Sequence, residues 1–478
     1  MNAAPRHLSQ DQLPALASLL DELGLRGSFG GEATIYGDDP VIRSPHRLAT
    51  ASGTALLAGG VAAAAIRHAR TGKTTDLSID IIHALHHLHP THFVEQMGYP
   101  CNVGAEYVAT NGFFPTRDGT YLMIEAGPPY AKLQDGYLRF FDCANSKEAL
   151  KSRIAEWDAE KLETALADAG LPGCRAFTRE DWLEHPQGRA LAGKPVVEIE
   201  KIADGEPVPF AETTDAPLTG IRVFDFTHVL AGPRSTQTLA EYGADVLHIS
   251  SPTHPDTLPQ HLCVDHGKRC AYLELTDSDD MDVARGLLAG ADVFATTYRP
   301  TVNERFGLLP AGLAERSERG IVCMTANAYG WDGPWRQRPG FDQNAQVATG
   351  FALREGSDGV PAFSPVFYLA DLTTGHLAAA GMMVALLRRA TEGGSYHVRV
   401  SLARSAMWVQ DLGLLDPEAI ADLARADVHD ARITEVDTSF GRVSALSAPL
   451  SFSNLAYPAA DRLVPYGADE PVWDVLHG

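Results

Sequence analysis

The sequence predicts an α/β protein with a large domain built on a parallel sheet and a smaller α/β domain ahead of it. Three observations predict this fold class. Short β-branched runs alternate with helical stretches from Pro217 onward, a shorter α/β segment precedes them, and an acidic, proline-containing stretch separates the two. Such alternation is typical of parallel strands joined by crossover helices.

The large domain is expected to open with a buried strand at Ile221–Thr227, a helix from Ala231 to Ala244 and a strand at Asp245–Ser250. The runs CAYLEL, DVFATTY and GIVCMTAN predict three further strands. The turn after the first strand, His228 to Pro233, lacks the G-x-G-x-x-G pattern. Its absence disfavours a dinucleotide-dependent dehydrogenase.

The smaller domain is predicted from the strand GTYLMIEA and the helical stretches KEALKSRIAEW and AEKLETALADAG. Between the two domains, Ala203 to Pro217 is acidic, holds three prolines and has no amphipathic period. This stretch is interpreted as a linker.

Composition narrows the range of functions. The chain has 39 Lys and Arg against 61 Asp and Glu, a net charge of −22, which disfavours nucleic-acid binding. The longest apolar stretch, Ala55 to Ile66, is too short to span about 30 Å of hydrocarbon, so no membrane helix is expected. The N-terminus lacks a secretory pattern and the six cysteines lack C-x-x-C spacing. A cytoplasmic protein with free thiols is expected.

A weak internal repeat relates the two halves. Residues 49–85 share the outline of residues 370–406: a helix rich in small residues, a glycine turn and a strand. Gly53 pairs with Gly375 at an offset of 322, and Asp80 with Ser401 at an offset of 321, which predicts one residue gained or lost between them. The duplication predicts two copies of one structural unit.

Asp371 lies at the start of the second copy's helix, where a carboxylate either caps the free N–H groups or carries chemistry. The equivalent position in the first copy is Ala49 or Thr50, so the helix can form without this carboxylate.

Two further clusters admit a functional or an ordinary interpretation. Basic residues at predicted strand ends and in a Gly-Pro-rich loop could bind an anionic ligand or be solvated surface charge: Lys268, Arg269, Arg299, Arg305, Arg336 and Arg338. Five histidines between His83 and His92 have partly helical spacing, but Glu95 is the only nearby carboxylate, so no metal site is predicted.

Five segments in the same order resemble the family III CoA-transferases: PLTGIRVFDFTHVLAGP with LAEYGADVLHI, HGKRCAYLEL, DVFATTYRPTVNERFGL, YGWDGPWRQRPGFDQNAQVATG and ADLTTGHLAAAGMMVALL. They cover about Pro217 to Val409. In the first half, FFPTRDGTYLMIEA and the segments up to KPVVEI resemble the family's small domain, and GRVSALSAPLSFSN resembles its closing residues.

The resemblance implies a Rossmann-like CoA-binding domain in an intertwined architecture, assembled from two incomplete, complementary family copies. Residues 1–100 would be a partial copy of the large domain, 101–202 the small domain, 203–217 a linker, 218–415 the CoA-binding domain and 416–478 a closing segment. The family forms intertwined dimers, so a homodimer or a pseudo-dimer within one chain is expected.

By the same resemblance, Asp371 would be the nucleophile in CoA transfer between an acyl-CoA and a carboxylic acid, through a mixed anhydride and an aspartyl-CoA thioester. CoA would be a substrate, and no cofactor or metal would be permanently bound. The implied CoA contacts are a loop with Leu230 and Ala231, the basic residues Lys268, Arg269 and Arg305 near the phosphates, and Leu273, Thr297, Tyr298, Arg299, Phe341 and Asp342 along the rest.

Two alternatives stay open. Racemases of the same fold carry a histidine where this sequence has Phe341, and a phenyl ring cannot carry a proton, which disfavours racemisation. A CoA-binding protein without turnover is the other alternative, and the intact Asp371 counts against it.

Overall fold

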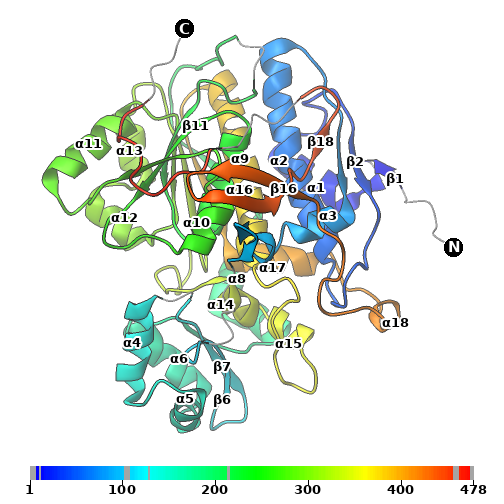
Figure 1. Ribbon diagram of the computed structural model, residues 1–478, viewed down its shortest axis with the longest axis vertical. Helices are drawn as coiled ribbons and strands as arrows, with labels where there is room; N and C mark the ends of the chain where they lie inside the picture. The colour runs from blue at the N-terminus through cyan, green and yellow to red at the C-terminus, as the bar shows by residue number, and fades with distance from the viewer. Residues whose placement is uncertain are drawn as a thin grey trace.

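A seven-stranded sheet forms the centre of the large domain in the computed structural model, which describes residues 7–9, 12–101, 108–127, 130–212, 216–455 and 462–473 (Figure 1). The strand order is β12-β11-β10-β13-β14-β15-β9. The strands are β9 (Glu198–Ala203), β10 (Arg222–Phe226), β11 (Asp245–Ser250), β12 (Arg269–Tyr272), β13 (Val293–Thr296), β14 (Val322–Asn327) and β15 (Ser395–Ser401). All neighbours pair in parallel except β9, which is antiparallel to β15.

This sheet confirms the strands predicted after Pro217. Strand β13 is buried at every position and β14 at all but its last, as expected of parallel strands that helices cover on both faces. The helices of this domain are α9 (Ala231–Glu241), α10 (Leu258–Val264), α11 (Ser278–Ala289), α12 (Pro300–Phe306), α13 (Pro310–Arg316), α14 (Asp342–Ala348), α15 (Phe351–Glu355), α16 (Leu369–Glu392) and α17 (Leu402–Asp411).

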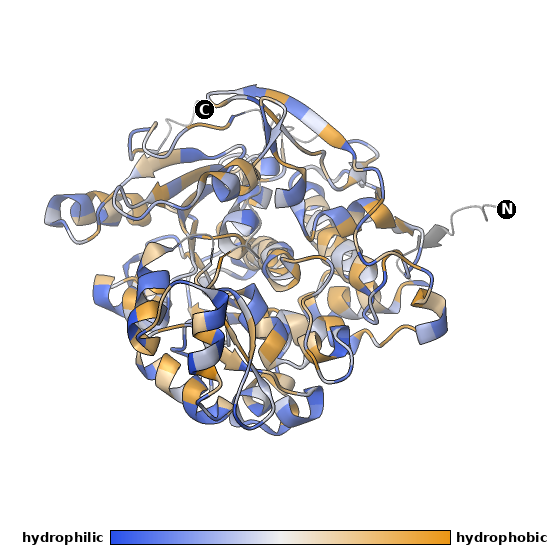
Figure 2. Cartoon of the chain, turned by 60° about the horizontal axis from the view of Figure 1, so that its bottom comes forward, coloured by the Kyte–Doolittle hydropathy of each residue, from blue (hydrophilic) through white to orange (hydrophobic). Residues whose placement is uncertain are grey.

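The small domain lies at the lower end of the molecule in Figure 1 and has its own antiparallel sheet in the order β6-β7-β8. Its elements are β6 (Gly112–Pro115), β7 (Tyr121–Ile124), β8 (Gly173–Arg175), α4 (Ala131–Phe141), α5 (Lys147–Ile154), α6 (Ala159–Asp168), α7 (Arg179–Glu184) and α8 (Pro186–Ala192). Tyr137, Leu150 and Leu162 are fully buried in its core. Figure 2 shows hydrophilic and hydrophobic residues alternating along the outer helices, as helices with one buried face require.

Three strands near the N-terminus and one from the C-terminal part form a second, smaller sheet in the order β1-β2-β3-β18. Its elements and their neighbours are β1 (His7–Ser9), α1 (Pro14–Leu23), β2 (Ala33–Tyr36), α2 (Leu48–Thr71), β3 (Leu77–Asp80), α3 (Ile81–His86), the 3₁₀ turn η2 (Pro90–Phe93), β4 (Glu95–Gln96) and β5 (Tyr99–Pro100). The C-terminal part adds α18 (Pro417–Ile420), β16 (Ile433–Thr438), β17 (Gly441–Leu446) and β18 (Ser451–Phe452).

Helices α2 and α16 are the structural counterparts that the sequence repeat predicts. Each has 24 residues, and they pack against each other in the core. By length and composition both could cross a membrane, but nearly all of their residues are buried inside the protein. Their glycines and alanines allow the two backbones to approach closely, which gives them a role as core helices.

The repeat has one constant offset. Leu48 corresponds to Leu369 at the start of the helix, Gly72 to Gly393 just after its end, and Asp80 to Ser401 at the following N-cap, each pair 321 residues apart. The expected gain or loss of a residue is therefore wrong, and so is the pairing of Gly53 with Gly375. Thr50, rather than Ala49, corresponds to Asp371.

Each half of the chain contributes a strand to a sheet of the other half. Strand β9 follows the small domain in sequence but pairs with β15 of the large sheet, and β18 from the C-terminal segment pairs in the same antiparallel way with β3. Strand β17 also pairs with β4 of the first half. Residues 198–202, expected in the small domain, thus belong to the large sheet. Residues 204–212 of the expected linker have no regular structure, and residues 213–215 lie outside the described part.

Candidate active site

Asp371 is the third residue of α16 and is not the cap of that helix. The N-cap position is Tyr368, and it makes no side-chain capping hydrogen bond. The backbone N–H of Asp371 instead donates to Asp342 Oδ2 over 2.6 Å, so Asp342 supplies the carboxylate that this first turn attracts. The capping interpretation of Asp371 is therefore wrong, and its own carboxyl remains available for chemistry.

Three buried carboxyl groups meet at this helix end. Asp342 begins α14, Asp371 lies in the first turn of α16, and Glu125 follows β7 of the small domain. Asp371 is 6 % exposed, Glu125 4 % and Asp342 0 %. Burial, together with the charges of Asp342 and Glu125, raises the pKa of Asp371 far above its usual range. Acidic groups this close cannot all ionise at neutral pH.

Burial also raises the pKa values of the Asp342 and Glu125 carboxyls. Burial raises the pKa of Asp342, although N–H groups of the α16 start and the Gln346 amide donate to it and oppose the rise. Burial and then the charge of Asp342 raise the pKa of Glu125 to about 8. The cluster therefore holds protons in the resting protein, an arrangement found at acid-base sites.

Glu125 was missed by sequence reasoning. The signal was present, since a glutamate directly follows the apolar run YLMI of a buried strand, where a charged residue is unusual. Its significance depends on the fold, because only the docking of the small domain brings β7 to the starts of α14 and α16.

The small domain contacts the large one beside this cluster. The rings of Tyr130 and Phe341 stack with centroids 5.9 Å apart, and the Tyr130 hydroxyl donates to Asp256 over 3.1 Å. Asp256 also accepts the backbone N–H of Val229 over 2.8 Å. One carboxylate thus connects the small domain to the loop after β10.

That loop contains the predicted CoA residues Leu230 and Ala231. Val229 has a φ of 69°, which is strained for a β-branched residue. The strained loop turns the chain into α9, with Leu230 at the N-cap position and Ala231 as the first helical residue. The hydroxyl of Thr297 accepts the backbone N–H of His228 over 2.9 Å and ties the loop to the end of β13.

Five further predicted residues lie in three places. Thr297, Tyr298 and Arg299 follow β13 at the same sheet edge as the loop, and the Tyr298 ring stacks on His228 at 4.4 Å. Arg305 on α12 is exposed, and its guanidinium lies 5.4 Å from the centre of the Phe306 ring. Leu273 is buried just after β12.

The side chains of Lys268 and Arg269 bind other residues of the protein. The ammonium of Lys268 is 0 % exposed and lies 3.0 Å from Asp225 Oδ2 and 2.8 Å from Asp265 Oδ1. Arg269 pairs with Asp245 and donates to the Val472 carbonyl. The Lys268 ammonium is thus enclosed by carboxylates and is not directed toward a ligand.

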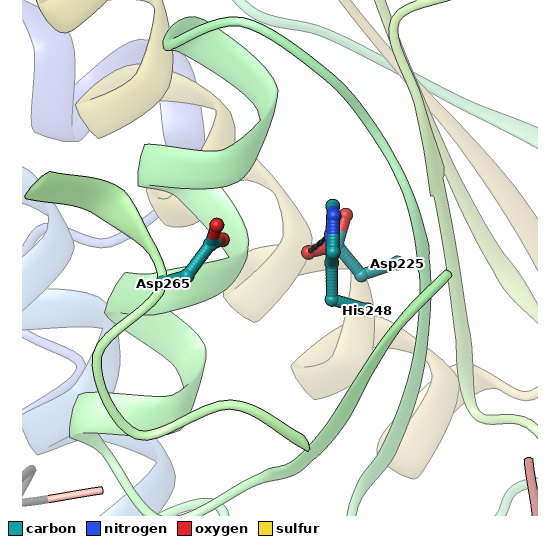
Figure 3. A group of neighbouring side chains, drawn as sticks. All are labelled: Asp225, His248 and Asp265. Atoms are coloured by element: carbon teal, nitrogen blue, oxygen red, sulfur yellow. Dashed lines mark hydrogen bonds and ion pairs between the residues drawn. The ribbon is translucent and has the colours of Figure 1, made fainter. Parts of the chain in front are cut away.

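Asp225, His248 and Asp265 form a group whose ligand atoms lie within 4.8 Å of one another, as a metal site would (Figure 3). Burial raises the pKa of Asp225, but the charges of Lys268 and His248 and several hydrogen bonds outweigh it and lower the net value. The Lys268 ammonium already supplies the cation of this group. The network holds the start of the loop after β10, since Thr227 donates to Asp225 through both its N–H and its hydroxyl.

The histidines between His83 and His92 lie beside the C-terminal part of the chain. His86 Nε2 and His89 Nε2 lie 3.2 and 3.0 Å from Asp427 Oδ2, and His429 Nδ1 lies 3.1 Å from the other oxygen. A carboxylate does join this cluster, but it comes from Asp427 rather than from Glu95. His89 Nε2 and His429 Nδ1 make hydrogen bonds to this carboxylate, whereas both ring nitrogens of His86 are buried without a hydrogen-bond partner among the described residues.

In the comparisons with known proteins, this chain is similar to CoA-transferases. Residues 218–437 match the profile of CoA-transferase family III. The chain is 35 % identical over 302 residues to the acetyl-coenzyme A transferase nodX of Hypoxylon pulicicidum, covering 60 % of this chain and 50 % of that protein. It is 32 % identical over 212 residues to the beta subunit of the succinyl-CoA:L-malate CoA-transferase of Chloroflexus aurantiacus, covering 42 % and 52 %.

Among solved structures, the crystal structure of Rv3272 from M. tuberculosis is 31 % identical and covers 41 % of this chain and 56 % of that one, with a TM-score of 0.39. The chain spans about half the length of the curated relatives it matches.

Proposed function

We propose, from the premise that residues 218–437 belong to CoA-transferase family III, that this chain is an enzyme that transfers CoA between an acyl-CoA and a free carboxylic acid. The observation that carries the proposal is the position of Asp371. Its carboxyl is buried at the start of α16, is not used as a cap, and lies at the junction of the small domain and the large sheet.

Asp371 is the nucleophile in this proposal. Its ionised oxygen attacks the thioester carbonyl, a C–O bond forms, the C–S bond breaks and CoA leaves as a thiolate. The thiolate then attacks the aspartyl carbonyl of the mixed anhydride and releases the first acid as a carboxylate. The acceptor carboxylate attacks the aspartyl-CoA thioester, so that a second mixed anhydride forms and CoA leaves as a thiolate. The thiolate then attacks the acyl carbonyl of this anhydride, which gives the new acyl-CoA and releases the Asp371 carboxylate.

The CoA molecule would lie across the carboxyl edge of the parallel strands, where open α/β sheets bind their ligands. We assign the loop with Leu230 and Ala231, the segment Thr297 to Arg299, and Phe341 to this surface. Leu273, which is buried just after β12, would support this surface from inside the protein. Arg305 is the exposed cation proposed for the phosphates, since a guanidinium matches phosphate oxygens in geometry and charge.

Lys268 and Arg269 have a different part in this proposal from the phosphate contact that the sequence suggested. Both are engaged by carboxylates or carbonyl groups. Lys268 holds Asp225, which in turn holds Thr227 at the start of the CoA loop. We therefore assign Lys268 as a positioning residue and leave both side chains out of direct phosphate contact.

The small domain is proposed to exclude water from the intermediates. An anhydride and a thioester both hydrolyse if water enters, so a transferase gains from a covered site. Glu125 and Tyr130 lie against the large domain and support this role. The two halves of one chain would then form a pseudo-dimer that contains one nucleophile. We expect the protein to act in the cytoplasm.

Mass spectrometry after incubation with an acyl-CoA tests the proposal. A competent donor such as acetyl-CoA should add the mass of CoA to the peptide that contains Asp371, and hydroxylamine should convert that residue to a hydroxamate. Binding of CoA without any adduct or exchange would favour a binding protein instead. Exchange of the α-proton without transfer would favour a racemase.

A further inference from the structure

The carboxylate of Asp256 binds the small domain with one oxygen and the loop after β10 with the other. Its Oδ1 atom accepts the Tyr130 hydroxyl over 3.1 Å, and its Oδ2 atom accepts the backbone N–H of Val229 over 2.8 Å. All three residues are half-buried, so these hydrogen bonds are partly shielded from water. The proposed chemistry gives this carboxylate no role.

We propose that Asp256 is a positioning residue that couples the docking of the small domain to the conformation of the loop that binds CoA. This inference rests on the proposed CoA transfer, in which Leu230 and Ala231 contact CoA and the small domain excludes water. Asp256 acts through Val229 on one side and through Tyr130 on the other, and the reacting atoms lie elsewhere.

The chain next to Asp256 holds this carboxylate in place. Asp256 directly precedes Thr257, the N-cap residue of α10. The side-chain oxygen of Gln260 lies 3.3 Å from the backbone nitrogen of Thr257 and 3.0 Å from its hydroxyl, which fixes the start of the helix. Because Thr257 and Gln260 complete the cap, Asp256 is free to bind residues outside its own helix.

Val229 is the residue of the loop for which an external hydrogen bond matters most. Its φ of 69° is a conformation that β-branched residues avoid, and such a conformation persists only where neighbouring groups hold it. Leu230 and Ala231 follow Val229 directly. Release of the Val229 N–H would therefore move both proposed CoA contacts.

The loop also lies against the helix that carries the proposed nucleophile. The carbonyl oxygen of Ala231 is 2.7 Å from the point where a Cβ on Gly375 would lie, an approach that glycine permits. Gly375 is about one turn after Asp371 on α16. A shift of the loop would displace CoA relative to the Asp371 carboxyl, and a displacement of about 1 Å is enough to slow a reaction.

On the small-domain side, Gly127 leaves room for the Tyr130 ring to reach the large domain. A Cβ on Gly127 would lie 2.7 Å from the ring of Tyr130 and 3.3 Å from that of Phe341. The Tyr130 ring stacks on Phe341 while its hydroxyl donates to Asp256. Undocking of the small domain would remove this hydroxyl and leave the carboxylate free to turn away from Val229. The loop would thus keep its conformation best while the site is covered.

Hydrogen–deuterium exchange of the full chain, resolved at the amide of Val229, tests the coupling without any substrate. Asp256→Ala should exchange at least about tenfold faster than the wild type, because the amide loses a charged acceptor. Asp256→Asn should stay within about twofold, since its oxygen accepts the Val229 N–H and its amide donates to the Tyr130 oxygen.

Tyr130→Phe distinguishes coupling from a bond that holds the loop alone. This variant keeps the ring that stacks on Phe341 and removes no atom that contacts Val229. Exchange at Val229 should still rise at least about threefold, because the carboxylate loses the hydroxyl that orients it. The double variant with Asp256→Ala should exchange at the rate of Asp256→Ala alone. The matched control is Asp279→Ala, an exposed aspartate in the first turn of α11, which should leave the exchange unchanged.

Steady-state kinetics with acetyl-CoA give the corresponding functional readout. Asp256→Ala should raise the KM for acetyl-CoA by about tenfold and should hydrolyse a larger share of the thioester than the wild type does. Asp256→Asn should restore both values. A general loss of folded protein would instead lower kcat alone and leave the KM and the hydrolysed share unchanged.

Unchanged exchange at Val229 in Asp256→Ala or in Tyr130→Phe would overturn the proposal, and so would an Asp256→Asn variant that behaves like Asp256→Ala. If Asp256→Ala does not fold, Asp256→Asn and Tyr130→Phe still decide the question. Absence of a CoA adduct on Asp371 with every donor contradicts the transferase function instead. An adduct on Asp371 with unchanged exchange at Val229 leaves that function intact and contradicts only the role of Asp256.

Discussion

Asp342 Oδ2 lies 2.6 Å from the backbone nitrogen of Asp371 and holds the first turn of the helix that carries the proposed nucleophile. The first copy repeats this contact, since Asp39 Oδ2 accepts the backbone N–H of Thr50 over 2.8 Å. The two supporting aspartates lie outside the repeated segments and at different distances before the helix, 29 residues before Asp371 and 11 before Thr50. Only the second copy has a carboxyl at the supported residue.

Replacing Asp371 with Ala should abolish transfer, with a loss of at least about a thousandfold in kcat, because no other carboxyl can form the covalent intermediates. The variant should still bind CoA. The measurement is steady-state transfer with a donor identified by the CoA adduct, together with a search for an adduct on the neighbouring carboxyls of Asp342 and Glu125.

Thr50→Ala provides the matched control for that variant, because Thr50 has the equivalent position in the other copy. Its transfer rate should equal that of the wild type. Full turnover by Asp371→Ala would show that this carboxyl is not the nucleophile.

The rate of transfer should rise with pH through the neutral range. The proposed nucleophile reacts in its ionised form, and burial together with the charges of Asp342 and Glu125 raises the pKa of the Asp371 carboxyl far above its usual range. An exposed aspartate would already be fully ionised at neutral pH, so the rate would not change there. Glu125→Gln removes one of the neighbouring charges, so the rise should shift to lower pH, as a pH–rate profile of both proteins measures. An unchanged profile in the variant would show that Glu125 does not influence the ionisation of Asp371.

Arg305→Ala should weaken the binding of CoA by about tenfold, since a charge-assisted hydrogen bond contributes about 1.5–3 kcal/mol and exposure reduces this. A pantetheine thioester without the nucleotide should bind equally well to the variant and the wild type. Isothermal titration measures both, with Arg285→Ala, an exposed arginine on α11, as control. Equal weakening of both ligands would place Arg305 away from the phosphates.

Lys268→Met should destabilise the large domain by about 3–5 kcal/mol, because removing one partner of a buried ion pair leaves the other charge uncompensated. The ammonium is fully buried between Asp225 and Asp265, so the loss arises in the core. Thermal unfolding followed by circular dichroism should show a markedly lower transition temperature. An unchanged transition would mean that the carboxylates are satisfied without Lys268.

A fragment that begins near residue 215 should misfold, or fold and hydrolyse thioesters without productive transfer. It lacks β9, which pairs with β15, and α2, which packs against α16, and it also lacks Glu125. Solubility, circular dichroism and a parallel assay of hydrolysis and transfer measure the outcome. Transfer at the full rate by this fragment would contradict the complementary roles of the two halves.

The sequence by itself determined the parallel sheet, its strand boundaries to within a few residues, the duplicated helix and the position of Asp371. These features are local. Strand β11 begins and ends where its β-branched run does, and α2 and α16 follow from their small apolar residues and from glycines just past their ends. Hydrophobic period, turn residues and ordered motifs are all visible in a short stretch of chain.

Only the tertiary structure decided which distant residues meet. Lys268 has the spacing and charge of a phosphate ligand, but the folding of β10 and α10 encloses it between Asp225 and Asp265. Glu125 looks like the end of an ordinary strand until the small domain brings it to the starts of α14 and α16. Burial and proximity between segments far apart in the chain set these charges and pKa values, and neither property is encoded in a local pattern.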